Sequence, residues 1–161
     1  MNPRHLIAAT ATAAGALVMP ALAQENGAKL LLERFAATLS SHDIAAFAAL
    51  FAEDYVNHQI SAAAPAPSPD KSPKQGTVDF FAARLIGIPD LQVAIETTVV
   101  SNNRGAASFI YTGTHRGTYF GIAPTHRPIR FTSCDIFLVK NGRIVEHWGM
   151  GDTAGILAQL R

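Results

Sequence analysis

The segment Ile129–Thr153, IRFTSCDIFLVKNGRIVEHWGMGDT, decides the fold. Aromatic and β-branched residues fill both halves of the segment, and Asn141-Gly142 separates them. Asn-Gly readily adopts the positive φ angles that a short hairpin turn requires. The segment therefore predicts two antiparallel strands joined by a tight turn.

Alternation along the first of these strands places a carboxylate among apolar neighbours. With a period of two, one side of the strand carries Phe131, Ser133, Asp135, Phe137 and Val139. Burial in such surroundings disfavours the charged form of a carboxyl group, which suits Asp135 to exchange a proton with a carbon acid. Asp135 is therefore the first candidate catalytic residue. The alternative is a structural acid paired with Arg116 or Arg130.

Residues 1–23 have the layout of a secretory signal. A basic start at Arg4 precedes an apolar run over residues 6–19, and Ala21-Leu22-Ala23 forms a small-x-small cleavage motif. We expect cleavage after Ala23, a single domain over residues 24–161, and a periplasmic or secreted protein. An uncleaved membrane anchor is the alternative, but the run is short for a span of about 20 apolar residues. After cleavage we expect no stable membrane insertion.

The expected mature chain has balanced charge. Of 13 Lys and Arg residues only Arg4 lies in the leader, so 12 basic and 12 acidic residues remain in residues 24–161. Without a basic cluster, nucleic acid is not an expected partner. Cys134 is the only cysteine, which excludes an internal disulfide, and we expect it to pack as a small buried side chain.

The rest of the pattern predicts helices followed by strands. The expected elements are helices at 27–39, 44–51 and 77–86, a short extended segment at 55–58, a proline-rich loop or lid at 61–75, strands from 91 and over 106–116, a loop at 117–128, the hairpin, and a helix at 153–161. Helices segregated from four long strands in a meander indicate an α+β domain. We expect a ligand pocket between the helices and the sheet.

Several short motifs resemble one known family. They are LFAEDYVNH (50–58), IPDL (88–91), GTHRG (113–117), GIAPT (121–125), CDIF (134–137) and GRIVEHW (142–148). Together they resemble the SnoaL-like polyketide cyclases, also called ester cyclases, of the nuclear-transport-factor-2-like (NTF2-like) superfold. The resemblance implies a cone-shaped α+β fold with N-terminal helices packed on a curved antiparallel sheet and a short C-terminal helix. It also implies a homodimer, a ligand cavity, and neither a metal nor an organic cofactor.

The family resemblance also implies a chemistry and a residue for it. Characterised members close a ring of an aromatic polyketide by an intramolecular aldol reaction, with an aspartate on the penultimate strand as general acid and base. That aspartate falls on Asp135. The family pattern HWD is commoner than His147-Trp148-Gly149, so this chain lacks one carboxylate, although Asp152 lies close by in the sequence.

Three polar residues are further candidates. His147 has an imidazole that exchanges protons near neutral pH, so it could orient Asp135 or donate to a developing oxyanion; satisfied packing is the equal alternative. Whether His147 and Asp135 share a face depends on the strand register. Asn57 and His58 could bind substrate oxygens, or they could cap a helix end or lie in a solvated loop.

A set of rings could line the expected pocket. It comprises Tyr55, Phe109, Tyr111, Phe131 and Trp148, with His115 as a weaker member on the strand face of Tyr111. The same aromatic residues are equally explained as core. The histidines show no close metal-ligand spacing, so we expect no metal site. The alternative is a cluster of ligands that are distant in the sequence and brought together by the fold.

Two functions of different classes fit these features. The first is an exported, cofactor-independent enzyme that uses Asp135 for acid-base chemistry on a small hydrophobic carbonyl compound, by cyclisation, isomerisation or dehydration. The second is a non-catalytic carrier or sensor that binds a small hydrophobic ligand in the same cavity, because this superfold hosts both.

Overall fold

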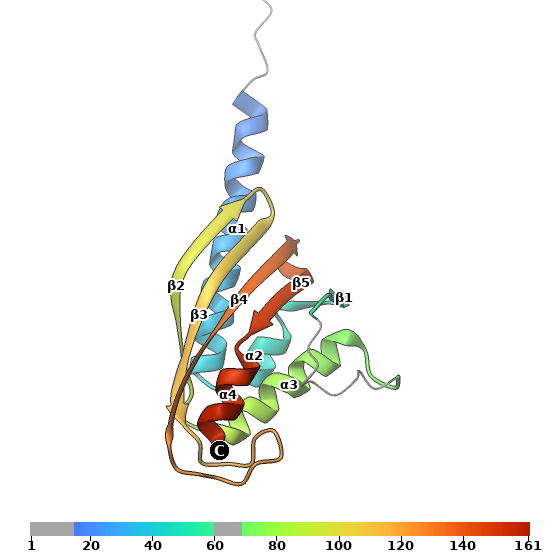
Figure 1. The fold of residues 1–161 in the computed structure, drawn as a ribbon. Helices are drawn as coiled ribbons and strands as arrows, with labels where there is room; N and C mark the ends of the chain where they lie inside the picture. Colours follow the sequence, from blue (N-terminus) through green and yellow to red (C-terminus); the bar gives the residue numbers. More distant parts are fainter. Residues whose placement is uncertain (1–14, 60–68) are drawn as a thin grey trace, which may run out of the picture.

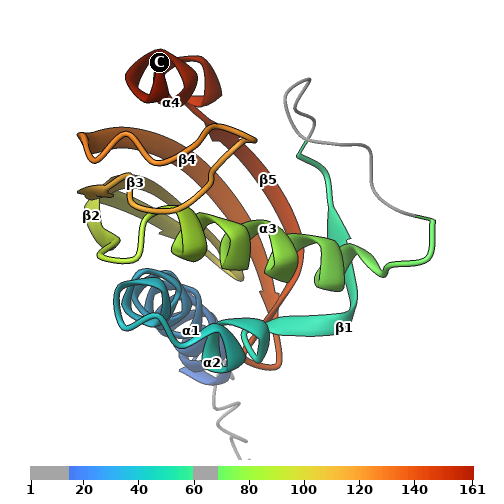
Figure 2. The same cartoon turned by 90° about the horizontal axis from the view of Figure 1, so that it is seen from below.

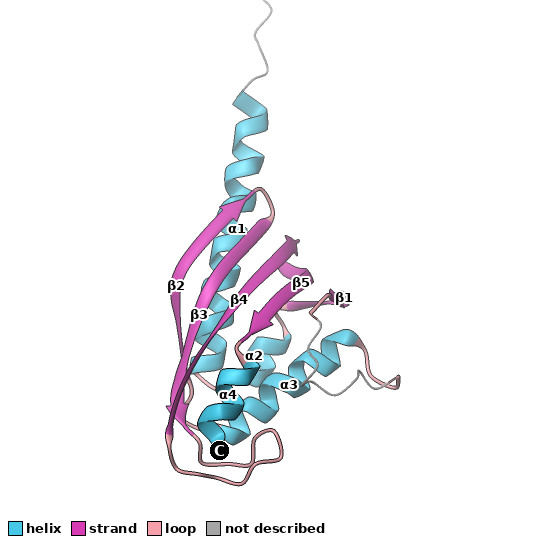
Figure 3. Cartoon of the chain, viewed as in Figure 1, coloured by secondary structure: helices cyan, strands magenta, loops and turns pink. Residues whose placement is uncertain are grey.

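The computed structural model describes residues 15–59 and 69–161, with side chains from residue 23 onward. It has an α+β architecture in which N-terminal helices pack on a curved, open sheet and a short helix ends the chain (Figures 1 and 3). This confirms the expected fold class. Residues 61–68 of the expected proline-rich lid and residues 1–14 of the leader lie outside the described residues.

Nine elements make up the described chain. In order they are α1 (Gly15–Ser40), α2 (Ile44–Ala48), β1 (Phe51–Asn57), α3 (Pro73–Gly87), β2 (Gln92–Ser101), β3 (Arg104–Thr114), β4 (Pro128–Lys140), β5 (Arg143–Gly151) and α4 (Thr153–Leu160). The sheet order is β1-β5-β4-β3-β2, and only the β1–β5 pair is parallel. The predicted hairpin is confirmed as β4 and β5, with Asn141 and Gly142 at φ 51° and 71°.

The second helix is shorter than its apolar pattern predicts. Asp43 caps it by accepting a hydrogen bond from the Ala46 backbone N–H, but α2 ends at Ala48 and Phe51 begins a strand. The Leu50 carbonyl accepts a 2.8 Å hydrogen bond from the Ile144 N–H of β5. Pairing with the sheet thus outweighs the helical pattern. The expected extended segment is the end of β1, which adds a fifth, parallel strand at the edge of the sheet.

Two other helices begin earlier than predicted. α3 begins at Pro73 because Ser72 caps it, accepting from the Gln75 N–H, and a proline fits the first helical position. α1 begins at Gly15 and continues through the expected cleavage site. Within the described part of the chain, no helix is both long and apolar enough to span a membrane.

The core lies between the sheet and α1, α2 and α3, which cover one face of it (Figure 2). The ring of Phe35 is at its centre, 5.1–5.5 Å from the rings of Phe47, Phe81, Phe109 and Phe137. Leu31 and Leu39 are buried on the same side of α1. These residues therefore form the buried side of α1.

Two of the family-like motifs meet at one end of the molecule. Asp90 of IPDL accepts a 2.6 Å hydrogen bond from the Thr114 backbone N–H and lies 3.6 Å from the Arg116 guanidinium. Gly113 lies so close to Ile88 that any Cβ there would collide with it. These motifs therefore hold the end of α3 against the end of β3.

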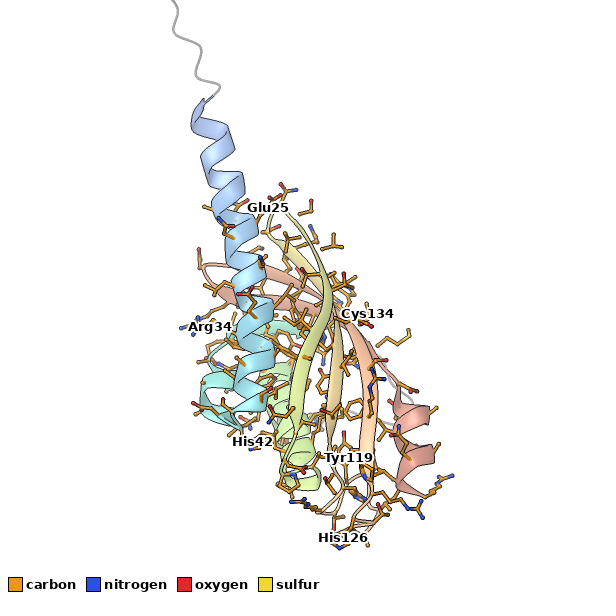
Figure 4. The ribbon with its side chains drawn as sticks, turned by 90° about the vertical axis from the view of Figure 1, so that its left-hand side faces the viewer. Glu25, Arg34, His42, Tyr119, His126 and Cys134 are labelled. Atoms are coloured by element: carbon orange, nitrogen blue, oxygen red, sulfur yellow. The ribbon has the colours of Figure 1, made fainter. Side chains whose placement is uncertain are left out.

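Cys134 is exposed, so its prediction as a buried packing residue is wrong. It lies on the outer side of β4, away from α1 (Figure 4). The alternation that turns Asp135 inward turns Cys134 outward, to the face that α1, α2 and α3 do not cover.

Candidate active site

Asp135 and His147 form a buried pair on the inner face of the β4–β5 hairpin. The register pairs Asp135 with Gly149 and Phe137 with His147, which puts both side chains on one face. His147 Nε2 lies 2.8 Å from Asp135 Oδ1, and the two residues are 2 % and 4 % exposed. The strand register therefore brings these two predicted residues together.

Hydrogen bonds extend from His147 towards β1 and α3. His147 Nδ1 lies 3.1 Å from the Tyr55 hydroxyl. Thr77 donates to that hydroxyl over 3.4 Å, and the Asn57 side-chain amide donates to Thr77 Oγ1 over 3.2 Å. Two predicted ligand-binding residues, Tyr55 and Asn57, thus belong to the network of Asp135.

Another branch reaches Asp135 along β4 from β3. The Ser133 hydroxyl donates to Asp135 Oδ2 over 2.5 Å and lies 3.3 Å from the Tyr111 hydroxyl. Because the single Ser133 proton goes to the carboxylate, Ser133 accepts from Tyr111. Each of the two Asp135 oxygens therefore receives a hydrogen bond, one from His147 and one from Ser133.

All donors in this network, assigned from its geometry, point towards Asp135. Burial raises the pKa of both Tyr55 and Tyr111, so both hydroxyls keep their protons and can donate. With Tyr55 donating to Nδ1, the neutral His147 ring carries its proton on Nε2 and donates it to Asp135. This arrangement suits an ionised carboxylate that accepts at both oxygens.

Gly149 makes room for the pair. A Cβ at this position would collide with Asp135 Oδ1 and would lie 2.6 Å from His147 Nε2. The departure from the HWD pattern is therefore coupled to the close contact between Asp135 and His147. Asp152 does not replace the missing carboxylate, because it is exposed and caps α4 by accepting from the Gly155 N–H.

Neither arginine proposed as a partner of Asp135 pairs with it. Arg116 lies beside Asp90, and Arg130 is exposed. The arginine that shares the interior with Asp135 is Arg84 of α3, which sequence reasoning missed. The sequence does contain a pattern that indicates its burial: Arg84 follows Phe80 and Phe81 by four and three positions, which places it on their side of a helix.

His58 and Trp148 lie apart from the buried pair. Their rings stack at 4.5 Å with an interplanar angle of 6°, and His58 Nε2 is 2.9 Å from a Glu146 carboxylate oxygen. Glu146 and Trp148 flank His147 in β5, so they occupy the outer face of the strand. The structure therefore divides the predicted site residues between two faces.

The remaining predicted residues lie inside. Tyr111 and Phe131 stack with centroids 4.7 Å apart, while Phe109 packs in the core against Phe35. His115 is fully buried, and its Nδ1 accepts from the Thr125 backbone N–H. No hydrogen bond between the described residues joins His115 to the Asp135 network.

Neither of two hollows among the described residues is lined by Asp135 itself. One has a volume of about 700 Å³ and runs along α4, β4 and the end of β5; the other has about 550 Å³ beside β1. Ser133, whose hydroxyl donates to Asp135, lines the first hollow, while Asp135 itself is buried. The described residues do not gather three or more side chains that could ligate a metal.

The family model for the SnoaL-like polyketide cyclases matches residues 29–160. The chain belongs to the SnoaL-like polyketide cyclase family. Its match includes every residue of the Asp135 network, and the family suggests cyclase chemistry that needs no cofactor.

Solved structures support the same fold. IdmH from Streptomyces antibioticus, assigned as a polyketide cyclase, is 28 % identical, with a TM-score of 0.70 over 82 % of this chain and 96 % of IdmH. TsrD from Streptomyces laurentii is 22 % identical, with a TM-score of 0.70 over 84 % and 95 %. AclR from Streptomyces galilaeus, assigned as a hydroxylase, is 21 % identical, with a TM-score of 0.71 over 84 % and 82 %. Among curated proteins, none is similar enough in sequence to count as a match.

Proposed function

We propose that this SnoaL-like protein is an exported acid-base catalyst that acts on a small hydrophobic carbonyl compound, with Asp135 as the group that takes and returns the proton. One observation carries the proposal: Asp135 is buried, and all donors of its network point towards it. A carboxylate held in this way is a positioned base in an interior with little water.

Intramolecular aldol closure is the reaction that fits best. Asp135 removes a proton from a carbon beside one carbonyl, and the electron pair of the C–H bond moves into an enolate. The enolate carbon then forms a bond to a second carbonyl carbon, whose π electrons move to oxygen. That oxygen takes the proton back from Asp135, so the carboxylate is restored and the product is an isomer of the substrate.

His147 acts as a positioning residue in this proposal. It donates to one Asp135 oxygen, while Tyr55 fixes its tautomer through Nδ1. Ser133 holds the other oxygen. A base fixed at both oxygens loses little freedom when it meets a substrate proton.

Hydrogen exchange at carbon tests the proposal without knowledge of the natural substrate. Hydrophobic ketones such as 2-tetralone are incubated with the protein in D₂O, and the loss of their α-proton signals is followed by NMR. We expect catalysed exchange that falls by about 10²–10⁴-fold in Asp135→Asn, the usual contribution of a general base.

Asp54→Asn is the matched control, because Asp54 is an exposed carboxylate of β1. We expect this variant to catalyse exchange of the α-protons of the ketone at the wild-type rate. Equal exchange by Asp135→Asn and wild type would refute the assignment of Asp135. Ligand binding without exchange in any variant would instead favour the carrier or sensor function.

Export is the second part of the proposal. The layout of residues 1–23 supports it, with a small-x-small motif that ends at Ala23. Mass spectrometry of the protein from its own host should show a mature chain that begins at Gln24. A cytoplasmic protein that retains residues 1–23 would contradict export.

We also propose a homodimer that forms through the outer face of the sheet. The strand register aligns Val99, Ala106, Ile136 and Trp148 in one row across four strands. Val99 is 68 % exposed, Ile136 41 % and Met150, one pair further along, 79 %. Such a face favours a second copy of the same chain. Light scattering should report a dimer for wild type and a monomer for Ile136→Lys.

A further inference from the structure

A buried arginine shares the interior with Asp135. Arg84 of α3 is 6 % exposed, and it lies at helical spacing from Phe80 and Phe81 on the side that faces the sheet. An arginine so deeply buried is uncommon unless an acidic group compensates its charge.

No such acidic group contacts Arg84 within the described residues. Its only hydrogen bond of good geometry runs from Nε to the Tyr119 hydroxyl, over 3.0 Å, and no carboxylate there lies within 4.0 Å of the guanidinium. Burial by itself would lower the pKa of Arg84, but Tyr119, Tyr111 and Asp135 outweigh it and leave this pKa above its usual value. The guanidinium is therefore a full positive charge in a largely buried position.

Aromatic rings hold the guanidinium in position without neutralising it. Its central carbon lies 4.7–5.1 Å from the ring centroids of Phe80, Phe81, Tyr111 and Phe131. Cation–π contacts of this kind contribute favourably, yet they satisfy none of the N–H donors. Rings on several sides also offer stacking surface to a flat ligand.

The two η nitrogens of Arg84 remain available. They make no hydrogen bond of good geometry, and the only fully enclosed side-chain nitrogen or oxygen without a partner among the described residues is His115 Nε2. The η nitrogens therefore keep contact with space that a ligand atom or water can enter. An arginine presents these donors as a planar fork that matches an anionic oxygen or a carboxylate.

Tyr111 connects this cation to the proposed base. Its ring lies under Arg84, and its hydroxyl donates to Ser133, which donates to Asp135. A positive group and a negative group thus occupy one interior without forming an ion pair. A ligand between them would meet a proton acceptor at one side and an anion-binding group at the other.

We propose that Arg84 is an anion-binding subsite for an aromatic ligand that carries a negatively charged oxygen, either a carboxylate or the enolate oxygen of the reaction above. This inference rests on the proposed function for the location of the ligand near Asp135. It adds the substrate class, an aromatic acid or a stabilised enolate.

Tyr119 accepts the hydrogen bond from Arg84 and so fixes the guanidinium. It belongs to the loop between β3 and β4, at the end of the molecule that also carries His126 (Figure 4).

Calorimetric titration of the full-length protein with 2-naphthoate and with methyl 2-naphthoate tests the subsite. These two probes share a ring system and differ in charge. We expect wild type to bind the acid at least about tenfold more tightly than the ester, since a charge-assisted hydrogen bond contributes about 1.5–3 kcal/mol. We expect Arg84→Met to lose this preference and Arg84→Lys to keep part of it.

Arg130→Met is the matched control, because it removes an exposed arginine, and it should bind both probes as wild type does. Near-UV circular dichroism checks that each variant folds. Should Arg84→Met not fold, the reduced preference of Arg84→Lys decides. Equal binding of acid and ester by wild type, no binding of either, or an undiminished preference in the folded Arg84 variants would overturn the subsite.

Asp135→Asn separates this inference from the proposed function. It should bind 2-naphthoate at least as tightly as wild type, because a nearby negative charge is removed. If acid binding depends on Arg84 while α-proton exchange does not depend on Asp135, the subsite stands and the proposed catalysis fails. If exchange depends on Asp135 but the preference for the acid survives in Arg84→Met, the proposed catalysis stands and the Arg84 subsite fails.

Discussion

Two histidines lie side by side in the sheet, one on each of its faces. The His58 backbone N–H donates to the His147 carbonyl over 2.7 Å, yet the side chains have opposite surroundings. His147 is enclosed and bonded through both ring nitrogens, whereas the His58 side chain is 37 % exposed and stacks on Trp148.

The difference shows how burial changes the contribution of a histidine's hydrogen bonds to stability. On the outer face, water competes for every polar contact and the pairing of His58 with Glu146 contributes little. On the inner face, Tyr55 and Asp135 have no water to replace His147, so removing it leaves buried groups unpaired. The two faces can therefore be compared by making equal changes on each.

The largest expected difference comes from removing each imidazole. We expect His147→Ala to lower the free energy of unfolding by about 3 kcal/mol, because the buried Asp135 carboxylate and Tyr55 hydroxyl each lose a hydrogen-bond partner. We expect His58→Ala to lower it by at most about 1 kcal/mol. Urea denaturation measures both, and equal losses would show that burial does not distinguish the two histidines.

A smaller difference is expected from adding one methyl group on each face. Gly149→Ala forces a Cβ against Asp135 and His147, so we expect a loss of about 1–3 kcal/mol, typical of overpacking, together with loss of α-proton exchange. Met150→Ala, at an exposed position, should change stability by less than about 0.5 kcal/mol. Wild-type stability and exchange in Gly149→Ala would contradict the packing described for the pair.

The smallest expected effect appears at high pH. Because burial raises the pKa of Tyr55 and Tyr111 above the ordinary value near 10, the folded state binds these protons more tightly than the unfolded state. Their contribution to stability is complete below pH 10 and is lost as the pH rises towards the folded pKa.

Removing one of these hydroxyls should make the loss of stability above pH 10 less steep. Tyr55→Phe also loses the hydrogen bond to His147, at a cost of about 1 kcal/mol at neutral pH. Unfolding curves at several pH values, with absorbance at 295 nm to follow tyrosine ionisation, measure both effects. A pH dependence that is identical in wild type and Tyr55→Phe would contradict the buried position of the hydroxyl.

The sequence predicted those features that depend on neighbours along the chain. Asn141-Gly142 located the hairpin, and alternation turned Asp135 inward. Whether His147 met Asp135 required the strand register, which is set across the sheet and not along it. For the same reason only the end of β1 was predicted as extended, because its partner β5 lies about 90 residues later in the chain.

Arg84 and Cys134 show the other limit. The burial of Arg84 was not predicted because a charged residue in a surface helix usually points to solvent, and only the assembled aromatic rings show that Arg84 does not. Cys134 was predicted to be buried because its neighbours in the sequence are apolar, but tertiary packing decides which face of the sheet the helices cover. For the burial of a strand residue, the face of the strand on which it lies was therefore a better guide than the hydrophobicity of its neighbours in the sequence.

The continuity of α1 has a consequence for maturation. The helix runs through Ala23, and the first buried side chain described along it is Ala28. Cleavage after Ala23, which we propose, would remove no described core residue and would leave Glu25 in the first turn of the shortened helix, where a carboxylate offsets the positive end of the helix dipole. A peptidase could thus trim the precursor before or after folding and obtain the same domain.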